Sequence, residues 1–269
     1  MESVLVLGSG GMLGYAVHEY FYRSGYNTIG VTRNDFDAVK SDITIINNQI
    51  ANADLVINCI GIIKQVIDNY TPYEIIKTNA VLPRNLAKLC KANNTPLIHI
   101  TTDCVYSGKR GNYSEKDLID AEDLYGVSKA AGDIEDCMTI RTSIIGPEKT
   151  TNRSLLGWTF SQRGKTVDGY TNHKWNGITT LHFAEIAERI MLDDIYEEGL
   201  FHLHSPDSMS KYEMVCIFNE IFSLGMTVNP CEAPEHCDRT LSSIYSLSKK
   251  ISTLTIKEQV KEMKKFFNL

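Results

Sequence analysis

The sequence predicts an α/β fold in which a doubly wound parallel sheet carries a small C-terminal lobe. Two observations lead to this fold class. Short runs rich in β-branched residues alternate with helical patterns along the first half of the chain, and a glycine-rich turn follows the first run. The length of 269 residues suits one large domain or a domain with a lobe, and 43% hydrophobic with 22% charged residues is ordinary for a globular protein.

Each predicted strand is a short apolar run bounded by polar or glycine residues. The runs cover residues 3–8, 27–32, 54–61, 96–102 and 138–146. Between the first two runs, apolar residues recur at helical spacing until Gly25. A second helical pattern covers residues 73–93, with Pro83 as its start or as a kink. This alternation predicts a parallel sheet covered by helices on both faces.

The regular alternation fades after about Pro147. We expect residues 148–269 to form mainly a second lobe, with residues 177–205 returning to the first domain and one more strand at 199–204. A capping-box pattern from Thr255 to Glu258 opens a last helix, whose apolar residues share one face.

Charge and cysteine content exclude several classes of function. The formal net charge is -6 and the 27 Lys and Arg residues are scattered, which argues against nucleic acids and anionic membranes as partners. The first apolar run is far shorter than a membrane span and lacks a basic leader, so we expect a cytoplasmic protein. Seven cysteines without a CxxC pair indicate reduced thiols, and the spacing of Cys231 and Cys237 matches no zinc pattern well, so no metal is expected.

A glycine-rich turn, GSGGMLG, follows the first predicted strand and precedes a helix. It supplies Gly8, Gly10, Gly11 and Gly14. Glycine lets backbone N–H groups approach a pyrophosphate, and the helix N-terminus favours the anion. A merely tight turn is the alternative, but the place of the motif at the start of a βαβ unit favours a dinucleotide-binding domain over residues 1–147.

The end of the second predicted strand bears on the choice of dinucleotide. An NAD enzyme usually places an acidic residue there, on the ribose 2′-hydroxyl. This chain has Arg33, which favours the 2′-phosphate of NADP(H) over NAD(H), although the nearby Asp35 leaves NAD open and Arg33 alone could be a solvated side chain.

The candidate acid is Tyr125, which stands four residues before Lys129 in YGVSK. Residues at this spacing share a helix face, so the ammonium group is expected to lower the pKa of the phenol and let it act as a general acid. Four tyrosines have a lysine at this spacing. We choose Tyr125 because it alone follows a buried strand with a hydroxyl-rich end and opens a helix of small residues; a structural tyrosine is the alternative.

Together these motifs resemble the extended short-chain dehydrogenases/reductases, and among them the dTDP-4-dehydrorhamnose reductase-like enzymes. The matching segments, in family order, are GSGGMLG, NCIG, TNAVLP, TTDCVYSG, YGVSK and RTSIIG. The resemblance implies a Rossmann domain in which Thr102 hydrogen-bonds the substrate carbonyl and Tyr125 protonates its oxygen. It further implies that Lys129 binds the nicotinamide ribose and that Asn79 supports a proton relay.

The cofactor contacts expected on this basis come from the glycine turn, the ends of the second and third strands, and the reactive pair. They are Gly8, Gly10, Gly11, Met12, Leu13, Gly14, Arg33, Asp42, Cys59, Ile60, Gly61, Tyr125 and Lys129.

Cys104 departs from the family pattern. The 4,6-dehydratases of the family carry Asp-Glu after the catalytic threonine, whereas Thr102 is followed by Asp103 and Cys104, which argues against dehydration. Cys104 resembles in position the cysteine with which GDP-fucose synthase epimerises. A thiolate there, with His173 returning the proton, would make the enzyme an epimerase as well; a small buried residue is the alternative.

Fewer residues point to the substrate, which the resemblance implies is a nucleotide sugar. Arg239 resembles an arginine that holds the substrate diphosphate, with a solvated arginine as the alternative. The remaining substrate-binding candidates are Lys64, Asp103, Arg153, His173, Trp175 and Asn176.

The sequence therefore predicts a reductase that converts a UDP- or dTDP-linked 4-keto-6-deoxy hexose to a 6-deoxy sugar. The stretch HKWNGITTL resembles that of capsule and O-antigen enzymes acting on UDP-linked 2-acetamido sugars, which slightly favours UDP. One alternative is an epimerase or dehydratase with retained NAD. Another is a non-catalytic NADP-binding regulatory subunit, since this fold also serves as a subunit of methionine adenosyltransferase. Homodimers are common in the family, and nothing in the sequence identifies an interface.

Overall fold

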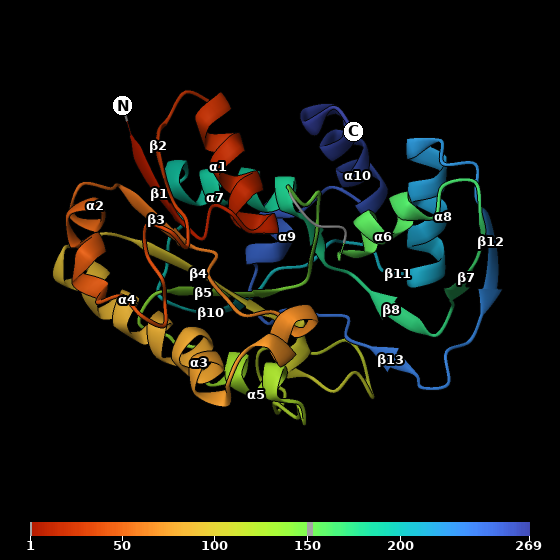
Figure 1. Cartoon of the computed structure of the whole chain (residues 1–269), viewed down its shortest axis with the longest axis horizontal. Coiled ribbons are helices and arrows are strands. Elements are labelled where there is room, and N and C mark those ends of the chain that lie inside the picture. Colours follow the sequence, from red (N-terminus) through yellow and green to blue (C-terminus); the bar gives the residue numbers. More distant parts are fainter. Residues whose placement is uncertain (1, 150–152) are drawn as a thin grey trace.

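A six-stranded parallel sheet lies at the centre of the computed structural model, which describes residues 2–149 and 153–269 (Figure 1). In sheet order the strands are β10 (Gly199–His202), β5 (Met138–Thr142), β4 (Leu97–Thr102), β3 (Leu55–Asn58), β1 (Ser3–Leu7) and β2 (Asn27–Val31). The predicted doubly wound α/β class is confirmed. The chain runs from β1 to β2 on one side of it and then crosses to β3 on the other side. Ligands of such sheets bind at the carboxyl ends of the strands at this switch point.

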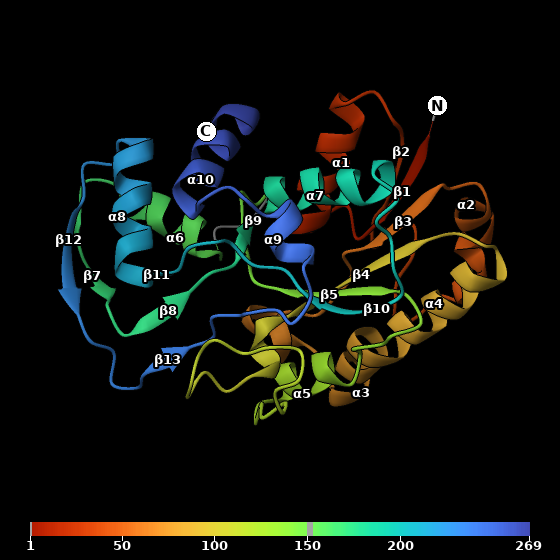
Figure 2. The same ribbon diagram turned by 180° about the vertical axis from the view of Figure 1, so that it is seen from behind.

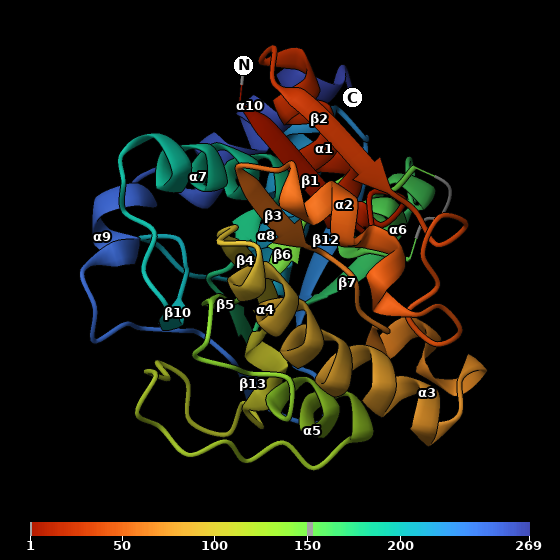
Figure 3. The ribbon, with the colours of Figure 1, turned by 90° about the vertical axis from the view of Figure 1, so that its left-hand side faces the viewer.

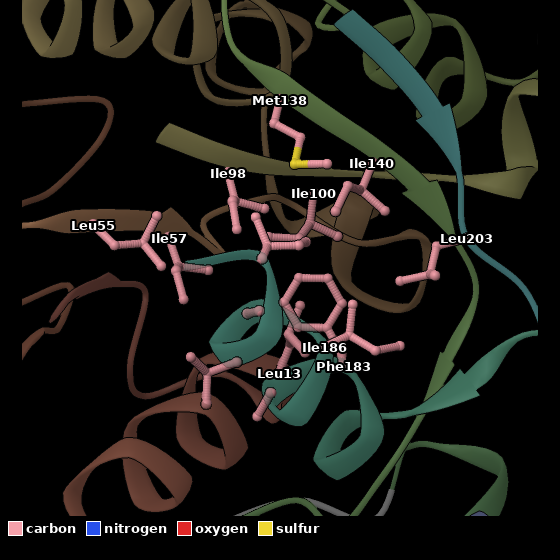
Figure 4. Packing of buried hydrophobic residues seen from close by; sticks show 14 of the residues in the cluster. Leu13, Leu55, Ile57, Ile98, Ile100, Met138, Ile140, Phe183, Ile186 and Leu203 are labelled. Atoms are coloured by element: carbon pink, nitrogen blue, oxygen red, sulfur yellow. The ribbon is translucent and has the colours of Figure 1, made fainter. Parts of the chain in front are cut away.

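Alternate residues of β1 enter two separate apolar cores because successive side chains of a strand point to opposite faces. Val4 and Val6 pack with α1 (Met12–Arg23) and α7 (Thr180–Leu192), a core that Figure 4 shows around Phe183. Leu5 and Leu7 pack with α2 (Asn47–Ala51) and α4 (Leu82–Ala92). Figure 3 shows these helices on the two sides of the sheet.

The helix predicted at 73–93 consists of three joined segments. They are α3 (Pro72–Ile76), the π-helical η3 (Lys77–Val81) and α4. Pro83 stands in the first turn of α4 and has no N–H to bond the backbone oxygen of Asn79. That oxygen instead packs against Gly132, where an added Cβ would lie 1.9 Å from it. The wide turn therefore brings Asn79 close to the next helix.

The second lobe has its own apolar core, formed around Phe218 and Val260. Its elements are α6 (Leu155–Ser161), β7 (Thr166–Tyr170), β8 (His173–Trp175), β11 (Met209–Ser210), α8 (Lys211–Phe222), β12 (Thr227–Cys231), β13 (Cys237–Asp238) and α10 (Ile256–Phe267). The predicted capping box opens α10, with Thr255 and Glu258 bonded to each other's backbone N–H. Figure 2 shows these elements gathered away from β1 and β2.

The connections complete the fold. They contain η1 (Ile43–Ile46), η2 (Lys64–Asn69), η4 (Asp103–Val105), α5 (Leu124–Ala130), β6 (Ile144–Ile145), β9 (Ile178–Thr179) and α9 (Leu247–Ile251). The strand expected at 199–204 is β10, which extends the central sheet beside β5. In residues 2–149 and 153–269, no helix is long and apolar enough to cross a membrane.

Candidate active site

The glycine turn closes tightly between β1 and α1. Gly8 has a φ of +82°, and its N–H donates to the Val31 oxygen at 2.8 Å. A Cβ on Gly14 would lie 2.1 Å from the Gly8 oxygen, so only glycine lets α1 pack against the turn. The first turn of α1 has no side-chain cap and no acidic residue. Its free N–H groups can therefore receive an anion.

A cavity of about 400 Å³ opens beside this turn, at the carboxyl ends of β1, β2 and β3. Of the expected cofactor contacts, seven line it: Gly8, Gly10, Gly11, Arg33, Cys59, Ile60 and Gly61. The other six, Met12, Leu13, Gly14, Asp42, Tyr125 and Lys129, do not line it. The Leu13 side chain packs in the core, Asp42 caps η1 through the Thr44 N–H, and Tyr125 lines a different cavity. The remaining lining residues were not among the expected contacts, although Thr78 opens the matching segment TNAVLP. They are Thr32, Asn34, Phe36, Asp37, Ala38, Val39, Ile62, Tyr70 and Thr78.

The cavity fits a dinucleotide in shape and polarity. A Cβ on Gly10 would meet no protein atom within 4 Å, so it would project into open space. The hydroxyl of Thr78 is buried and has no partner among the described residues, which leaves it for a ligand. The other polar groups of the lining are glycine N–H groups, the guanidinium of Arg33, and the side chains of Thr32, Asn34, Asp37 and Tyr70. The glycine N–H groups and the arginine are the kinds of group that bind a pyrophosphate and a ribose phosphate.

Arg33 stands at the edge of this cavity, with 58% of its side chain exposed. Its Nε donates to Asp37 Oδ2 at 3.0 Å and its Nη1 to the Tyr70 hydroxyl at 2.8 Å. These two hydrogen bonds raise the pKa of Arg33 further, so it is fully charged.

Thr102, Tyr125 and Lys129 lie on β4 and α5, beside the cavity rather than in its lining. Thr102 ends β4 and is hydrogen-bonded to Tyr125. Lys129 is 6% exposed and donates from Nζ to the Ile100 oxygen at 2.9 Å. A Cβ on Gly61 would lie 3.7 Å from that Nζ, which brings the ammonium group to the cavity wall.

Asn79 is hydrogen-bonded both to Ile62 and to Ser128. Its Nδ2 donates to the Ile62 oxygen and to the Ser128 hydroxyl, both at 3.0 Å, and its Oδ1 accepts from the Ile62 N–H at 2.8 Å. Ile62 belongs to the cavity wall, and Ser128 lies between Tyr125 and Lys129 on α5. Asn79 therefore links α5 to the cavity wall.

The pKa of Tyr125 shifts opposite to our expectation. Burial raises it above its usual range, nearby Cys104 adds to this, and the hydrogen bond with Thr102 opposes it. Lys129 does not lower it, because the ammonium group turns to the Ile100 oxygen of β4. Burial lowers the pKa of Lys129 itself to about 8, against the influence of Asp133. At neutral pH, both side chains are therefore protonated.

Asp103, Cys104 and Arg239 form a second polar group next to Thr102. Asp103 Oδ1 accepts from the Thr102 hydroxyl at 3.1 Å, and burial raises its pKa. Burial also raises the pKa of the Cys104 thiol to about 12, and Asp103 adds to the shift. Arg239 lies within electrostatic range of both and donates to the backbone oxygens of Tyr106 and Ser107. Its remaining N–H groups stay available for an anion.

The other substrate-binding candidates divide by position. Lys64 forms an ion pair with Asp123 at 2.7 Å, and both line a second cavity of about 440 Å³ together with Tyr125. Arg153 is exposed beside the undescribed segment. The following three lie on or beside β8. His173 bonds the Glu235 oxygen, Trp175 packs on the lobe core, and the Asn176 amide bonds both backbone groups of Leu241.

A parallel sheet with a glycine turn and a Thr-Tyr-Lys set is typical of the extended short-chain dehydrogenases/reductases. The chain belongs to the RmlD substrate binding domain family, which matches residues 1–267. Among residues 2–149 and 153–269, no cluster of histidine, cysteine and acidic residues could hold a metal ion.

Relatives of this chain carry two different names. It is 27% identical to dTDP-4-dehydrorhamnose reductase of Aggregatibacter actinomycetemcomitans, over 82% of this chain and 79% of that protein. It is 26% identical to methionine adenosyltransferase 2 subunit beta of Mus musculus, over 82% and 72%. The crystal structure of dTDP-4-dehydrorhamnose reductase from Bacillus anthracis in complex with NADP superposes with a TM-score of 0.79 at 18% identity, over 99% of both chains, which shows the shared fold.

Proposed function

We propose that the protein is an NADP(H)-preferring reductase of a nucleotide-linked 4-keto-6-deoxy hexose, with the 6-deoxy sugar as product. In this proposal, residues 1–147 bind the dinucleotide. Residues 148–269 mainly form the substrate lobe, and residues 177–205 return to the first domain, as the pairing of β10 with β5 supports. The observation that carries the proposal is that Thr102 is hydrogen-bonded to Tyr125, while Lys129 of the same helix reaches Gly61 in the wall of a cavity with a glycine turn and an arginine.

The residues of this site suit carbonyl reduction. A bound reduced nicotinamide would supply the hydride. Tyr125 keeps its proton at neutral pH because burial raises its pKa, so its phenol can donate that proton to the carbonyl oxygen as negative charge develops there. The Thr102 hydroxyl lies beside the phenol and would give a second hydrogen bond to the same oxygen by turning its proton away from Asp103 Oδ1. Lys129 would hold the ribose with its ammonium group, and Asn79 is a positioning residue for Tyr125 and Lys129.

The substrate diphosphate is assigned to Arg239. Arg239 lies within electrostatic range of Asp103, which follows Thr102, and two backbone oxygens use only part of its N–H groups. Lys64 is already paired with Asp123 at 2.7 Å. Asp103 and the β8 residues Trp175 and His173 would border the sugar. Asn176 would contribute indirectly, by holding the loop at Leu241, because its amide group is hydrogen-bonded to the backbone of that residue.

The environment of Cys104 opposes epimerisation in the same site. It needs a thiolate at Cys104, whereas burial raises the pKa of that thiol to about 12. The neighbouring Asp103 opposes ionisation further. We therefore propose reduction without epimerisation.

The relatives named as a subunit beta favour one other function, an NADP-binding subunit without turnover. In that function the cavity would bind dinucleotide and no ketone would be reduced. Stable co-purification with an enzyme partner and no NADPH oxidation would support it. The proposed location is the cytoplasm in either case. We also propose a homodimer, on the resemblance to the family alone.

The test is NADPH oxidation with a 4-keto-6-deoxy sugar generated in place, linked to UDP and, separately, to dTDP. Oxidation by the wild type that Tyr125→Phe loses, with unchanged NADPH binding, would support the reductase. The faster substrate identifies the nucleotide. No oxidation with either substrate, despite measurable NADPH binding, would refute it and favour the binding subunit.

A further inference from the structure

Tyr70 approaches the dinucleotide cavity from a different part of the chain than Arg33. It follows η2 in the connection between β3 and α3, whereas Arg33 follows β2. The two meet at the cavity, where Arg33 Nη1 donates to the Tyr70 hydroxyl at 2.8 Å. The guanidinium carbon lies 5.6 Å from the centre of the Tyr70 ring, within the range of a cation–π contact.

Asp37 holds the opposite edge of the guanidinium group, through Nε at 3.0 Å. Asp37 is itself fixed, because its Oδ1 accepts from the N–H groups of Val39 and Lys40 at 2.8 and 3.2 Å. One contact would leave the guanidinium plane free to turn about that contact. The two contacts together set its plane. The N–H groups that neither contact uses remain available at the cavity.

We propose that Tyr70 is a specificity-determining positioning residue, which orients Arg33 to receive the 2′-phosphate of NADP(H). The inference rests on the proposed function, since it needs Arg33 to contact that phosphate. Arg33 is the only cationic side chain among the described residues that line the cavity. A phosphate is recognised by charge-assisted hydrogen bonds whose strength depends on the plane of the guanidinium group.

The contribution of Tyr70 is confined to the phosphorylated dinucleotide. NAD(H) carries no 2′-phosphate, so it gains nothing from an oriented Arg33. Tyr70→Phe removes the hydroxyl and keeps the ring, and the wall of the cavity is preserved. The substitution therefore separates the orientation of Arg33 from simple lining of the cavity.

The experiment is calorimetric titration of five proteins with NADP⁺ and, separately, with NAD⁺. They are the wild type, Tyr70→Phe, Arg33→Gln, the double variant of these two, and the control Tyr73→Phe. The Tyr73 ring is exposed on α3 and lines neither cavity. We expect Tyr70→Phe to weaken NADP⁺ binding about fivefold and NAD⁺ binding less than about twofold. Arg33→Gln should weaken NADP⁺ binding about 30-fold, and Tyr70→Phe should add nothing in that background. Tyr73→Phe should change neither.

Each other outcome overturns the inference in a recognisable way. Equal losses of NADP⁺ and NAD⁺ binding in Tyr70→Phe would make Tyr70 a lining residue. A loss in Arg33→Gln without any in Tyr70→Phe would reject Tyr70 and keep the proposed contact of Arg33. An unchanged ratio of the two affinities in Arg33→Gln would reject both. Retained NAD⁺ binding in every variant shows that the proteins are folded.

Discussion

Replacing Lys129 by methionine should stabilise the protein at neutral pH while it removes NADPH oxidation. The side chain is 6% exposed, and burial lowers the pKa of its ammonium group from 10.5 to about 8. That difference corresponds to about 3 kcal/mol of unfavourable free energy for the charged form in the folded state. The variant also loses the hydrogen bond to the Ile100 oxygen, about 1 kcal/mol. The net gain of about 2 kcal/mol should raise Tm by roughly 5 °C.

The gain should depend on pH in a defined direction. The folded-state pKa of Lys129 lies below its unfolded-state value, so the cost of burying the charge is fully present below about pH 8. As pH rises from about 8 to 10.5, the folded protein gives up this proton before the unfolded chain does, and the cost disappears. The stability advantage of Lys129→Met should therefore vanish over this interval.

Urea denaturation of wild type and variant between pH 6.5 and 10.5 measures this advantage, because titrating groups common to both proteins cancel in the difference. Lys88→Met, at an exposed position on α4, is the control and should change stability little at any pH. A variant that is less stable than wild type at pH 7, or an advantage that stays constant up to pH 10.5, would refute the reasoning.

Three further predictions follow from the site and its support. Gly14→Ala should lower Tm and abolish NADP⁺ binding, because its Cβ would lie 2.1 Å from a backbone oxygen, whereas Gly10→Ala should keep Tm and lose binding only; equal effects in melting and titration experiments would contradict this. Arg141→Met should cost about 3–5 kcal/mol in urea denaturation, because it leaves Asp133 buried without the partner now at 2.7 Å; a loss below about 1 kcal/mol would contradict it. Incubation of a 4-keto sugar with enzyme in deuterated water, without reductant, should leave the sugar undeuterated by NMR, because burial raises the pKa of Cys104 to about 12. Deuterium incorporation by the wild type that is lost in Cys104→Ser would contradict this prediction and support epimerisation.

The sheet could be predicted because a strand that is buried on both faces is apolar along its whole length in the sequence. β1 is an example, since its side chains pack alternately into the two apolar cores. The run at 54–61 was predicted too long, since β3 ends at Asn58. Residues 59–61 are apolar or small for a different reason, which is that they form the cavity wall. Local pattern cannot separate these two causes. The π turn at Lys77–Val81 likewise depends on packing against Gly132, which lies far along the chain.

The candidate site was predictable where it follows a strand end and unpredictable where a loop folds back. Arg33 and Gly61 stand shortly after the ends of β2 and β3, and both line the cavity. Tyr70 has no such local signal, although it lies immediately before the capping box of α3, which fixes where the loop re-enters the fold. The spacing of Tyr125 and Lys129 correctly predicts one helix, but not the direction of the Lys129 side chain, which depends on the Ile100 oxygen.

The resulting electrostatics favour one direction of the proposed reaction. Reduction needs a phenol that holds its proton before the carbonyl oxygen becomes negative, and burial gives Tyr125 that proton at neutral pH. The reverse oxidation needs the phenolate, which burial and the neighbouring Cys104 and Asp103 all oppose. The ammonium group that could stabilise a phenolate is directed to β4 instead. In the proposed function, these residues therefore favour reduction near neutral pH, and the reverse reaction should accelerate as pH rises.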